Sequence, residues 1–545
     1  MLRLTELKLP LDHTAAELRA ALLNRLGITD AELRSCTLFR RGHDARKRGH
    51  IQLVYTLDIE TTCDAALLEK FARDPHLGRA PDTSYRPVAP APSGLDERPV
   101  VIGFGPCGLF AALILAESGF RPIVLERGTA VRERTRDTWG LWRERVLDPQ
   151  SNVQFGEGGA GTFSDGKLYS QIKDPRHLGR KVLAEFIAAG APEEIRYVSK
   201  PHIGTFRLVT MVQAMREKII ALGGEVRFRE QVTDLLVEDR QVTGVQLADG
   251  ERIATRHIVL AVGHSARDTF RMLHARGVHM EPKPFSIGLR VEHPQSIIDR
   301  ARFGTQAGHP LLGAADYKLV HHANNGRSVY SFCMCPGGTV VAATSAPGRV
   351  VTNGMSQYSR NERNANAAIV VGITPADFPS DDPLAGIALQ EDLEARAFVL
   401  GGGNYDAPAQ LVGDFLANRA STQLGEVIPS YRPGVRLTNL AGLLPDYATA
   451  AIREAMPAFG RQIPGFAAAD AVFTAVETRT SSPLRIRRVR DTLESINTPG
   501  LYPAGEGAGY AGGIYSAGID GIEIAEAVAR SLVAAHARRS GRQDL

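Results

Sequence analysis

One six-residue segment constrains the fold more than any other part of the chain. The segment GFGPCG, residues 103–108, directly follows the short apolar run 100–102 and opens an apolar stretch of helical character. This order of strand, glycine turn and helix is typical of a dinucleotide-binding βαβ unit. We expect Gly103 to allow a tight turn and Gly105 to leave room for a pyrophosphate at the positive end of the helix. Gly108 would let the helix pack closely on the strand.

The rest of the chain must distinguish FAD from NAD, because domains for both share this unit. Glu126 ends the next predicted strand about twenty residues later, where an acidic side chain can accept hydrogen bonds from an adenosine ribose. A second glycine-rich loop, residues 152–166, offers backbone contacts that the longer flavin needs. Near the end of the sequence, residues 505–507 and 512–514 open another helix, whose N-terminus can face the ribityl chain or the flavin N1/O2 edge. The three glycine-rich segments favour FAD.

These segments and several others resemble one known family over nearly the whole chain. The family is the uncharacterised FAD-dependent dehydrogenases of bacteria, within the wider glutathione-reductase-like flavoproteins. The resemblance is carried by VIGFGPCGLFAA (101–112), FGEGGAGTFSDGKL (155–168), KPHIGTFRL (200–208), FCMCPGGTVV (332–341), TNGMSQYSRN (352–361), ETRTSSPLRI (477–486) and LYPAGEGAGYAGGIYSAGIDG (501–521).

The resemblance implies an α/β fold: a glutathione-reductase-like FAD-binding Rossmann domain, an inserted α+β substrate domain and a small N-terminal α+β domain. Many relatives in the wider superfamily carry an Asp that binds a ribityl hydroxyl where Glu506 stands, and Glu is longer by one methylene group. The residues that the resemblance places around FAD are Gly103, Gly105, Pro106, Gly108, Glu126, Arg127, Gly158, Gly159, Val232, Ala261, Gly263, Gly505, Glu506, Gly513 and Ile514.

The domain limits follow from changes in pattern along the chain. Thr14 and Glu17 form a capping box before leucines at helical spacing, and alternating apolar residues over 51–59 predict a half-buried strand. Asp64 is expected to cap a second short helix. We predict an N-terminal α+β domain at 1–80, a Pro-rich linker at 81–98, the first part of the FAD-binding domain at 99–268, an inserted substrate domain at 269–495 and the last part of the FAD-binding domain at 496–545.

The predicted N-terminal domain carries a basic run at residues 40–48, RRGHDARKR, between two of its strands. Such a run is usually the solvated end of a hairpin, but it could also bind RNA or a phosphate. The whole chain has 64 basic and 60 acidic residues and only 6% aromatics, which does not favour a nucleic-acid partner.

Candidates for reacting groups are less clear than those for cofactor binding. Arg479 and Glu477 precede the segment that completes the FAD domain, and an arginine there could bind a carboxylate substrate or stabilise reduced flavin. His202 is a candidate acid or base, as are His264 and His293, although each is more often structural. Cys333 and Cys335 are separated by one residue, which suits a redox pair, half of a metal site, or two buried strand cysteines. We predict no metal site.

Composition and local pattern set the remaining expectations. The 43% hydrophobic and 23% charged residues are typical of a globular chain, and five scattered cysteines do not make a disulfide framework. No signal pattern or transmembrane run is recognisable, so we expect a cytoplasmic protein. The glycine run at 401–404 lacks the spacing of a second dinucleotide unit and predicts a loop. NAD(P)H or a protein redox partner would therefore have to reach the flavin without a dedicated NAD(P)-binding Rossmann domain in this chain.

The leading hypothesis is an FAD-dependent oxidoreductase, a dehydrogenase that transfers a hydride between a small-molecule substrate and flavin N5. The first alternative is an RNA-directed flavoprotein that uses the basic N-terminal domain for docking. A flavin-binding sensor or scaffold without turnover is a third.

Overall fold

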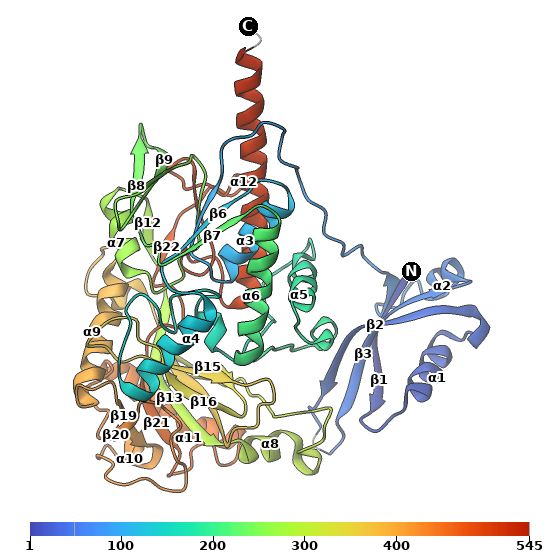
Figure 1. The fold of residues 1–545 in the computed structure, drawn as a ribbon. Coiled ribbons are helices and arrows are strands. Elements are labelled where there is room, and N and C mark those ends of the chain that lie inside the picture. The colour runs from blue at the N-terminus through green and yellow to red at the C-terminus, as the bar shows by residue number, and fades with distance from the viewer. Residues whose placement is uncertain (48, 544–545) are drawn as a thin grey trace.

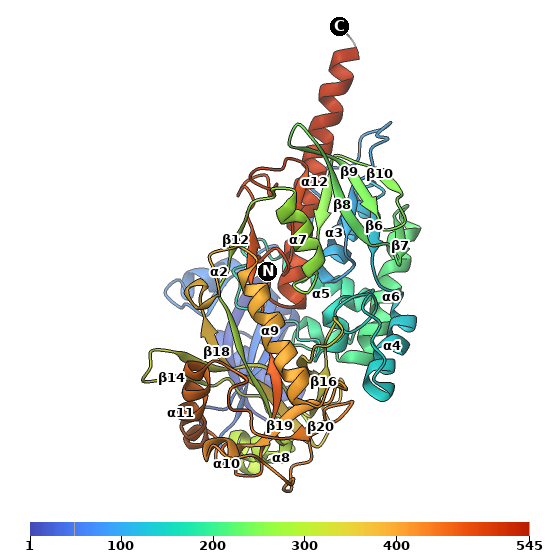
Figure 2. The same ribbon diagram turned by 90° about the vertical axis from the view of Figure 1, so that its left-hand side faces the viewer.

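The computed structural model describes residues 1–47 and 49–543 of the 545-residue chain. Their fold is mixed α/β, and the three largest sheets in this part of the chain have four, five and seven strands (Figure 1). The four-stranded sheet lies to one side of the body (Figure 1), and the C-terminal helix α12 extends from the top of the body in both views (Figures 1 and 2).

The N-terminal unit is one antiparallel sheet with strand order β2-β3-β1-β4, covered by two helices. The capping box of Thr14 and Glu17 is confirmed. The expectation for Asp64 is wrong in detail: Cys63 holds the cap position, and Asp64 is the first helical residue, its carboxylate accepting the Thr61 N–H at 2.8 Å. The elements are β1 (Leu2–Pro10), α1 (Ala15–Leu26), β2 (Leu33–Asp44), β3 (Gln52–Thr61), α2 (Asp64–Lys70) and β4 (Leu77–Arg79).

The basic segment 40–48 is only partly a hairpin end. Residues 40–44 continue strand β2 and pair with β3, so the expectation of a loop is wrong there; residue 48 lies outside the described residues. Arg41 also bridges in parallel to Val198 of the body, its N–H donating to the Tyr197 carbonyl at 2.6 Å. Arg46 pairs with the neighbouring Asp44 at 2.6 Å. Part of the charge in this segment is thus compensated locally.

The linker between the N-terminal unit and the body has neither helix nor strand from residue 80 to residue 99. It is nevertheless attached to the body, because the Ala91 N–H donates to the Ser118 carbonyl at 2.8 Å. Glu97 accepts a hydrogen bond from His257 at 2.7 Å.

The five-stranded sheet is parallel, with strand order β23-β11-β5-β6-β7. Its strands are β5 (Val100–Ile102), β6 (Ile123–Glu126), β7 (Glu225–Phe228), β11 (Ile258–Leu260) and β23 (Leu501–Pro503). Because β23 pairs with β11, the last part of the sequence completes the same sheet that begins at residue 100, as expected. A small antiparallel sheet, β8 (Val232–Glu238), β9 (Gln241–Leu247) and β10 (Arg252–Ala254), is inserted after β7.

Helix α3 lies at the centre of this domain because ten consecutive residues, 107–116, are buried. A helix that is apolar on all sides must be covered by other elements, and α12 packs along it. The helices of this part are α3 (Pro106–Glu117), α4 (Val131–Trp139), α5 (Leu178–Ala188), α6 (Thr205–Ala221), α7 (Arg267–Ala275) and α12 (Ile514–Gln543).

The middle of the chain forms the seven-stranded sheet, with strand order β14-β15-β18-β13-β21-β19-β20. Its central strands β13 and β18 are buried along almost their whole length, so both faces of the sheet are covered. The strands are β13 (Phe285–Pro294), β14 (Val320–His322), β15 (Ser328–Cys335), β18 (Asn364–Ile373), β19 (Ala407–Leu411), β20 (Val435–Leu437) and β21 (Val472–Glu477). The helices are α8 (Gln295–Phe303), α9 (Ala385–Leu400), α10 (Val412–Leu416) and α11 (Asp446–Gln462).

Two short turns connect strands of the middle region. Residues 325–326 join β14 to β15, and residues 336–337 join β15 to β16 (Gly338–Ala342), which pairs with β17 (Thr352–Ser356). The glycine run 401–404 is a loop after α9, as predicted. Strands β12 (Met280–Pro282) and β22 (Leu484–Ile486) pair where the chain enters and leaves the middle region.

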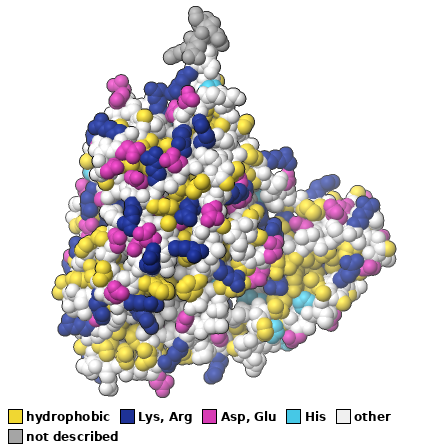
Figure 3. Space-filling model, in the orientation of Figure 1, with side chains coloured by type: hydrophobic (Ala, Val, Ile, Leu, Met, Phe, Trp, Pro, Cys, Tyr) yellow, Lys and Arg dark blue, Asp and Glu magenta, His cyan; other side chains and the backbone are white. Residues whose placement is uncertain are grey.

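Within residues 1–47 and 49–543, no helix combines the length and apolarity that crossing a bilayer requires. Basic and acidic side chains are interspersed over the face seen in Figure 3, in line with the nearly balanced charge.

Candidate active site

A cavity of about 370 Å³ lies at the carboxyl ends of the parallel strands β5, β6 and β11. This is the edge at which open α/β sheets bind ligands. The far wall comes from the seven-stranded sheet, through the end of β15 and the segment that follows β21. The cavity therefore lies between the five-stranded and the seven-stranded sheet.

The three glycines of the turn after β5 differ in whether the fold itself requires a glycine at that position. Gly103 has a φ of +94°, and a Cβ there would lie 2.5 Å from the Ala261 carbonyl oxygen. A Cβ on Gly108 would collide with the Gly103 carbonyl oxygen, so this residue allows the close packing of α3 on the turn. Gly105 differs, because its φ is −76° and its Cβ would make only an ordinary 3.6 Å contact with the Gly159 Cα. Gly105 therefore has no internal requirement for glycine, and with Pro106 it lines the cavity at the N-terminus of α3.

The acidic residue at the end of β6 is in the cavity wall, as the sequence indicates. The Glu126 carboxylate accepts the backbone N–H groups of Phe104 at 2.8 Å and of Gly128 and Gly156 at 2.9 Å. The loop after β5, the loop after β6 and the second glycine loop are thus joined at one carboxylate. Arg127 lies beside it, over the Phe155 ring at 4.4 Å.

The second glycine-rich loop divides into two sides. Gly159 lines the cavity against Gly105, whereas Gly158 donates its N–H to the Phe104 carbonyl at 2.9 Å and lines a smaller cavity behind the loop. The loop is held by Arg134 of α4, a fully buried side chain that donates to the carbonyls of Asn152, Val153 and Glu157 at 2.7–2.8 Å. Sequence reasoning missed Arg134, since an arginine in an amphipathic helix usually faces solvent.

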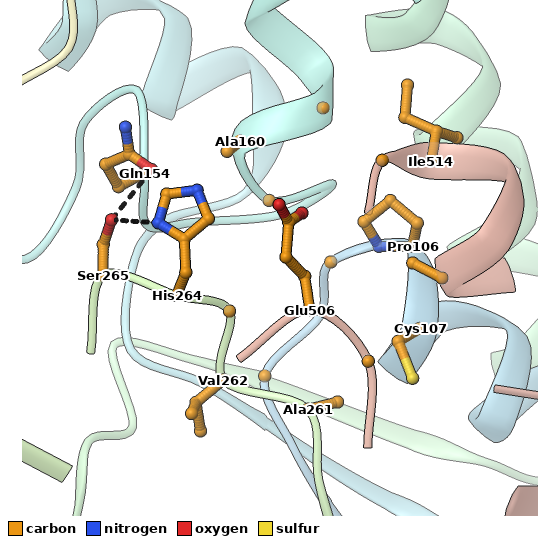
Figure 4. A pocket seen from close by; sticks show the side chains of 18 of the residues that line it. Pro106, Cys107, Gln154, Ala160, Ala261, Val262, His264, Ser265, Glu506 and Ile514 are labelled. Atoms are coloured by element: carbon orange, nitrogen blue, oxygen red, sulfur yellow. Dashed lines mark hydrogen bonds between the residues drawn. The ribbon is translucent and has the colours of Figure 1, made fainter. Parts of the chain in front are cut away.

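The segment before α12 contributes a carboxyl group that extends into the cavity. Figure 4 shows the Glu506 side chain between Pro106 and His264. Burial raises the pKa of Glu506 to about 7, against the opposing effects of the Gly513 backbone and the Lys283 ammonium. A carboxyl group in this position can accept a hydrogen bond from a ligand hydroxyl or, when protonated, donate one. Of the other predicted cofactor residues, Gly108 does not line the cavity, whereas the following six do: Val232, Ala261, Gly263, Gly505, Gly513 and Ile514.

A chain of hydrogen bonds forms the wall after β11. Ser265 contacts the Gln154 amide oxygen at 3.1 Å and His264 Nδ1 at 3.0 Å (Figure 4). Burial, reinforced by the guanidinium groups of Arg479 and Arg267, lowers the pKa of His264 to about 3. His264 therefore presents a neutral ring to the cavity at any ordinary pH.

Arg479 lines the cavity, but most of its donors are used internally. Its guanidinium donates to both oxygens of Glu394 at 3.0 Å and to the hydroxyls of Ser265 and Ser345 at 3.0 and 2.8 Å. Four of the five N–H groups of an arginine are thereby engaged. A substrate carboxylate would have one N–H of Arg479 available, so a bidentate clamp does not fit this geometry.

Glu477 also lines the cavity and is held from behind. Arg290, which is fully buried, donates to its two carboxylate oxygens at 2.9 and 3.0 Å, and Thr352 donates at 3.1 Å. Sequence reasoning missed Arg290, because nothing in the strand around it indicates an ion pair with the distant Glu477.

The structure does not bring His202 or His293 to this cavity. His202 stacks on Tyr358 and contacts its carbonyl oxygen at 3.0 Å, and burial lowers the pKa of the imidazole to about 4. His293 contacts the Phe466 carbonyl at 2.6 Å. The expectation of an acid–base role for His202 is therefore not supported by its position.

Comparison with known proteins shows the family to which this chain belongs. Residues 284–480 match a family model described as "FAD-dependent protein, C-terminal domain-like", and residues 1–60 match a domain of unknown function. A protein of Clostridium beijerinckii, described as "Uncharacterized protein", is 46% identical over 529 residues, which are 96% of this chain and 98% of that protein. The chain belongs to this family of FAD-dependent proteins. FAD is its cofactor.

Solved structures of flavoenzymes are among those similar to this chain. L-proline dehydrogenase from P. horikoshii is 14% identical, with 80% of this chain and 94% of that chain covered and a TM-score of 0.34. Glycine oxidase from Bacillus cereus is 11% identical, with 79% and 97% covered and a TM-score of 0.31.

The residues present fit FAD on structural grounds. Gly105 and Gly159 leave a side-chain-free floor at the N-terminus of α3, where a pyrophosphate would be favoured. Glu126, Val232 and Glu506 also line the cavity. Lys167, Cys333 and Glu477 line the same cavity from the side of the seven-stranded sheet.

Proposed function

We propose that this protein is an FAD-dependent dehydrogenase that transfers a hydride between a small-molecule substrate and flavin N5. The observation that carries the proposal is a single cavity that runs from Glu126, at the edge of the five-stranded sheet, to Cys333 and Glu477 of the seven-stranded sheet. In this arrangement the adenosine end belongs to a glutathione-reductase-like FAD domain, at 99–268 and 496–545. The inserted region, 269–495, covers the reactive end.

Different parts of the cavity wall would bind different parts of FAD. Glu126 would bind the ribose, Gly105 and Pro106 would border the pyrophosphate, and Glu506 would bind a ribityl hydroxyl. Bound FAD would supply the two-electron chemistry, and the protein would supply position, charge and exclusion of water.

The side chains around the reactive end would set the local charge. Arg479 is fixed by Glu394 and keeps a positive charge at the wall, which would favour an anionic substrate or the anionic reduced cofactor. His264 would stay neutral beside it and act through hydrogen bonds. Because Arg479 has one free donor, we propose that it has a positioning role and does not clamp a substrate carboxylate.

The test is anaerobic reduction of the purified, FAD-bound protein by NADH, NADPH and fractionated metabolite mixtures, followed by loss of flavin absorbance. Free FAD in the same mixtures controls for reduction without the protein. Rapid bleaching by at least one small-molecule donor is expected. If dithionite is the one reductant that works, the protein binds FAD without turnover and the proposal is wrong.

A further inference from the structure

The two cysteines at the end of β15 lie in an irregular part of the strand. The pairing of β15 with β18 shifts register between Phe332 and Cys335, which is a β-bulge. Cys333 has a φ of +44°, a left-handed conformation that residues other than glycine rarely adopt. Bulges and strained backbone re-aim side chains and are frequent at functional sites. Here the bulge places Cys333 in the wall of the FAD cavity, while Cys335 is buried next to it.

Two cations hold this bulge by its carbonyl groups. Arg290 donates to the Cys333 carbonyl at 3.2 Å, and the Lys167 ammonium donates to the Met334 carbonyl. The Cys335 thiol donates to the same Cys333 carbonyl at 3.4 Å, so its sulfur is directed back toward Cys333. A bulge fixed by two cations and a thiol is a built feature of the site.

We propose that Cys333 and Cys335 form a dithiol–disulfide couple at the flavin end of the FAD cavity. In a regular strand, residues two apart have Cα atoms about 6.6–6.8 Å apart. That separation is at the upper limit of the roughly 4.4–6.8 Å that a disulfide spans. The Cys335 sulfur lies 3.4 Å from the Cys333 carbonyl oxygen, so the side chain of Cys335 is already next to Cys333 and the pair is within range.

The surroundings favour the reactive form of Cys333. The neighbouring Cys335 thiol lowers the pKa of the Cys333 thiol, and the charges of Lys167 and Arg290 lower it further against the effect of burial. The pKa of Cys335 is raised. The thiolate is the nucleophile in thiol–disulfide chemistry. Cys333 would therefore be the thiol that reacts first, and Cys335 would supply the second sulfur of the disulfide.

The chemistry of the couple balances with the cofactor of this family. In the oxidising direction two S–H bonds break and one S–S bond forms, and the two electrons and two protons pass to oxidised FAD. The reverse reaction returns them to the sulfurs. The protein would thus store two electrons beyond those that the flavin takes. A metal site is the competing reading of the pair, but the described residues contain no group of three or more His, Cys, Asp or Glu side chains placed to hold a metal ion.

The experiment uses the full-length, FAD-bound protein carrying Cys36→Ser and Cys63→Ser, which removes the two thiols of the N-terminal unit. After mild oxidation with diamide, it is titrated anaerobically with dithionite beside the same protein with Cys335→Ser added. We expect the first protein to take two more electrons per FAD than the second.

A second readout does not depend on the flavin. Trypsin cuts after Arg327 and Arg349, so both cysteines lie on one peptide, residues 328–349. In the oxidised protein this peptide should resist iodoacetamide after denaturation and weigh two hydrogens less than in the reduced protein. Cys335→Ser should abolish the difference.

Equal electron uptake by the two proteins, with both cysteines alkylated in every redox state, would overturn the couple. If Cys335→Ser fails to retain FAD, the peptide mass of the oxidised and reduced parent protein decides alone. Neither readout needs a substrate, so failure of the couple and failure of the proposed hydride transfer are distinguishable.

Discussion

At the residue scale, substitutions of the glycines in the turn after β5 distinguish an effect on cofactor binding from an effect on folding. Gly103 and Gly108 are required by the protein itself, because a Cβ at either position would meet backbone. Gly105 lines the cavity with an ordinary φ, and we propose that the space it leaves is used by the cofactor.

We therefore predict that Gly105→Val keeps the fold and loses FAD. Loss of two or three backbone–phosphate hydrogen bonds, at about 1.5–3 kcal/mol each, predicts FAD binding weaker by at least ~100-fold. The variant should also melt at a lower temperature because bound ligand stabilises the native state by mass action. Isothermal titration with FAD measures the affinity, and circular dichroism checks the fold.

Gly108→Ala is the matched control, because its methyl group would collide with the Gly103 carbonyl and should damage folding directly. A Gly105→Val protein that purifies with as much FAD as the unchanged protein would show that this turn does not bind the cofactor.

The same scale shows why the glycines and the acidic residue that line the cavity could be predicted from the sequence, whereas the hydrogen-bonded states of Arg479 and Glu477 could not. A glycine turn and the strand end at Glu126 are local, so spacing alone reveals them. The states of Arg479 and Glu477 depend on partners 85 and 187 residues away, Glu394 and Arg290. Nothing local to Arg479 indicates that four of its donors are already engaged. The bulge that turns Cys333 into the cavity is equally invisible in a run of strand-forming residues.

At the element scale, helix α9 joins the two sides of the cavity through one carboxylate. Glu394 is fully buried and accepts from Arg267 of α7 at 2.7 and 2.9 Å, and from Arg479 after β21 at 3.0 Å. Although burial acts in the opposite direction, the two guanidinium groups hold the pKa of Glu394 well below its ordinary value.

We predict that Glu394→Gln destabilises the protein by about 3–5 kcal/mol, because it leaves two buried cations without their counter-charge. Glu391→Gln on the same helix is the control. Glu391 pairs at 2.7 Å with Arg271, which is half exposed, and such a pair contributes less than about 1 kcal/mol. Denaturant unfolding of the two variants beside the parent measures the difference, and equal losses would refute the role given to Glu394.

Elements were predictable where local signals and tertiary packing agree. The capping box of Thr14 and the alternating strand at 51–59 are such cases. The basic segment 40–48 is the counter-example, since its charges suggest a solvated end. Pairing with β3 and the bridge from Arg41 to Val198 extend β2 through residue 44. These contacts outweigh the preference of a basic segment for a solvated loop.

At the scale of the whole molecule, the N-terminal unit stands apart from the chemistry. The described residues that line the cavity all lie between Ile102 and Ala517. The unit has its own sheet and meets the body at its edge, through the bridge to Val198 and a hydrogen bond from Ile51 to Gln306 at 3.2 Å. Arg180 of α5 also lies over the Phe39 ring at 3.8 Å.

We predict that removal of residues 1–80 leaves FAD binding unchanged and lowers thermal stability. The linker from residue 81 keeps its contacts with the body, including the Ala91 bond to Ser118. The truncated body, however, exposes the backbone at 197–199 and the Phe303 ring, which packs against His43. The ratio of flavin to protein absorbance should therefore equal that of the full chain, with a lower melting temperature. If the truncated protein folds but does not bind FAD, the N-terminal unit shapes the cavity from outside. The contact of Arg180 in α5 with the N-terminal unit would then be the route of that effect.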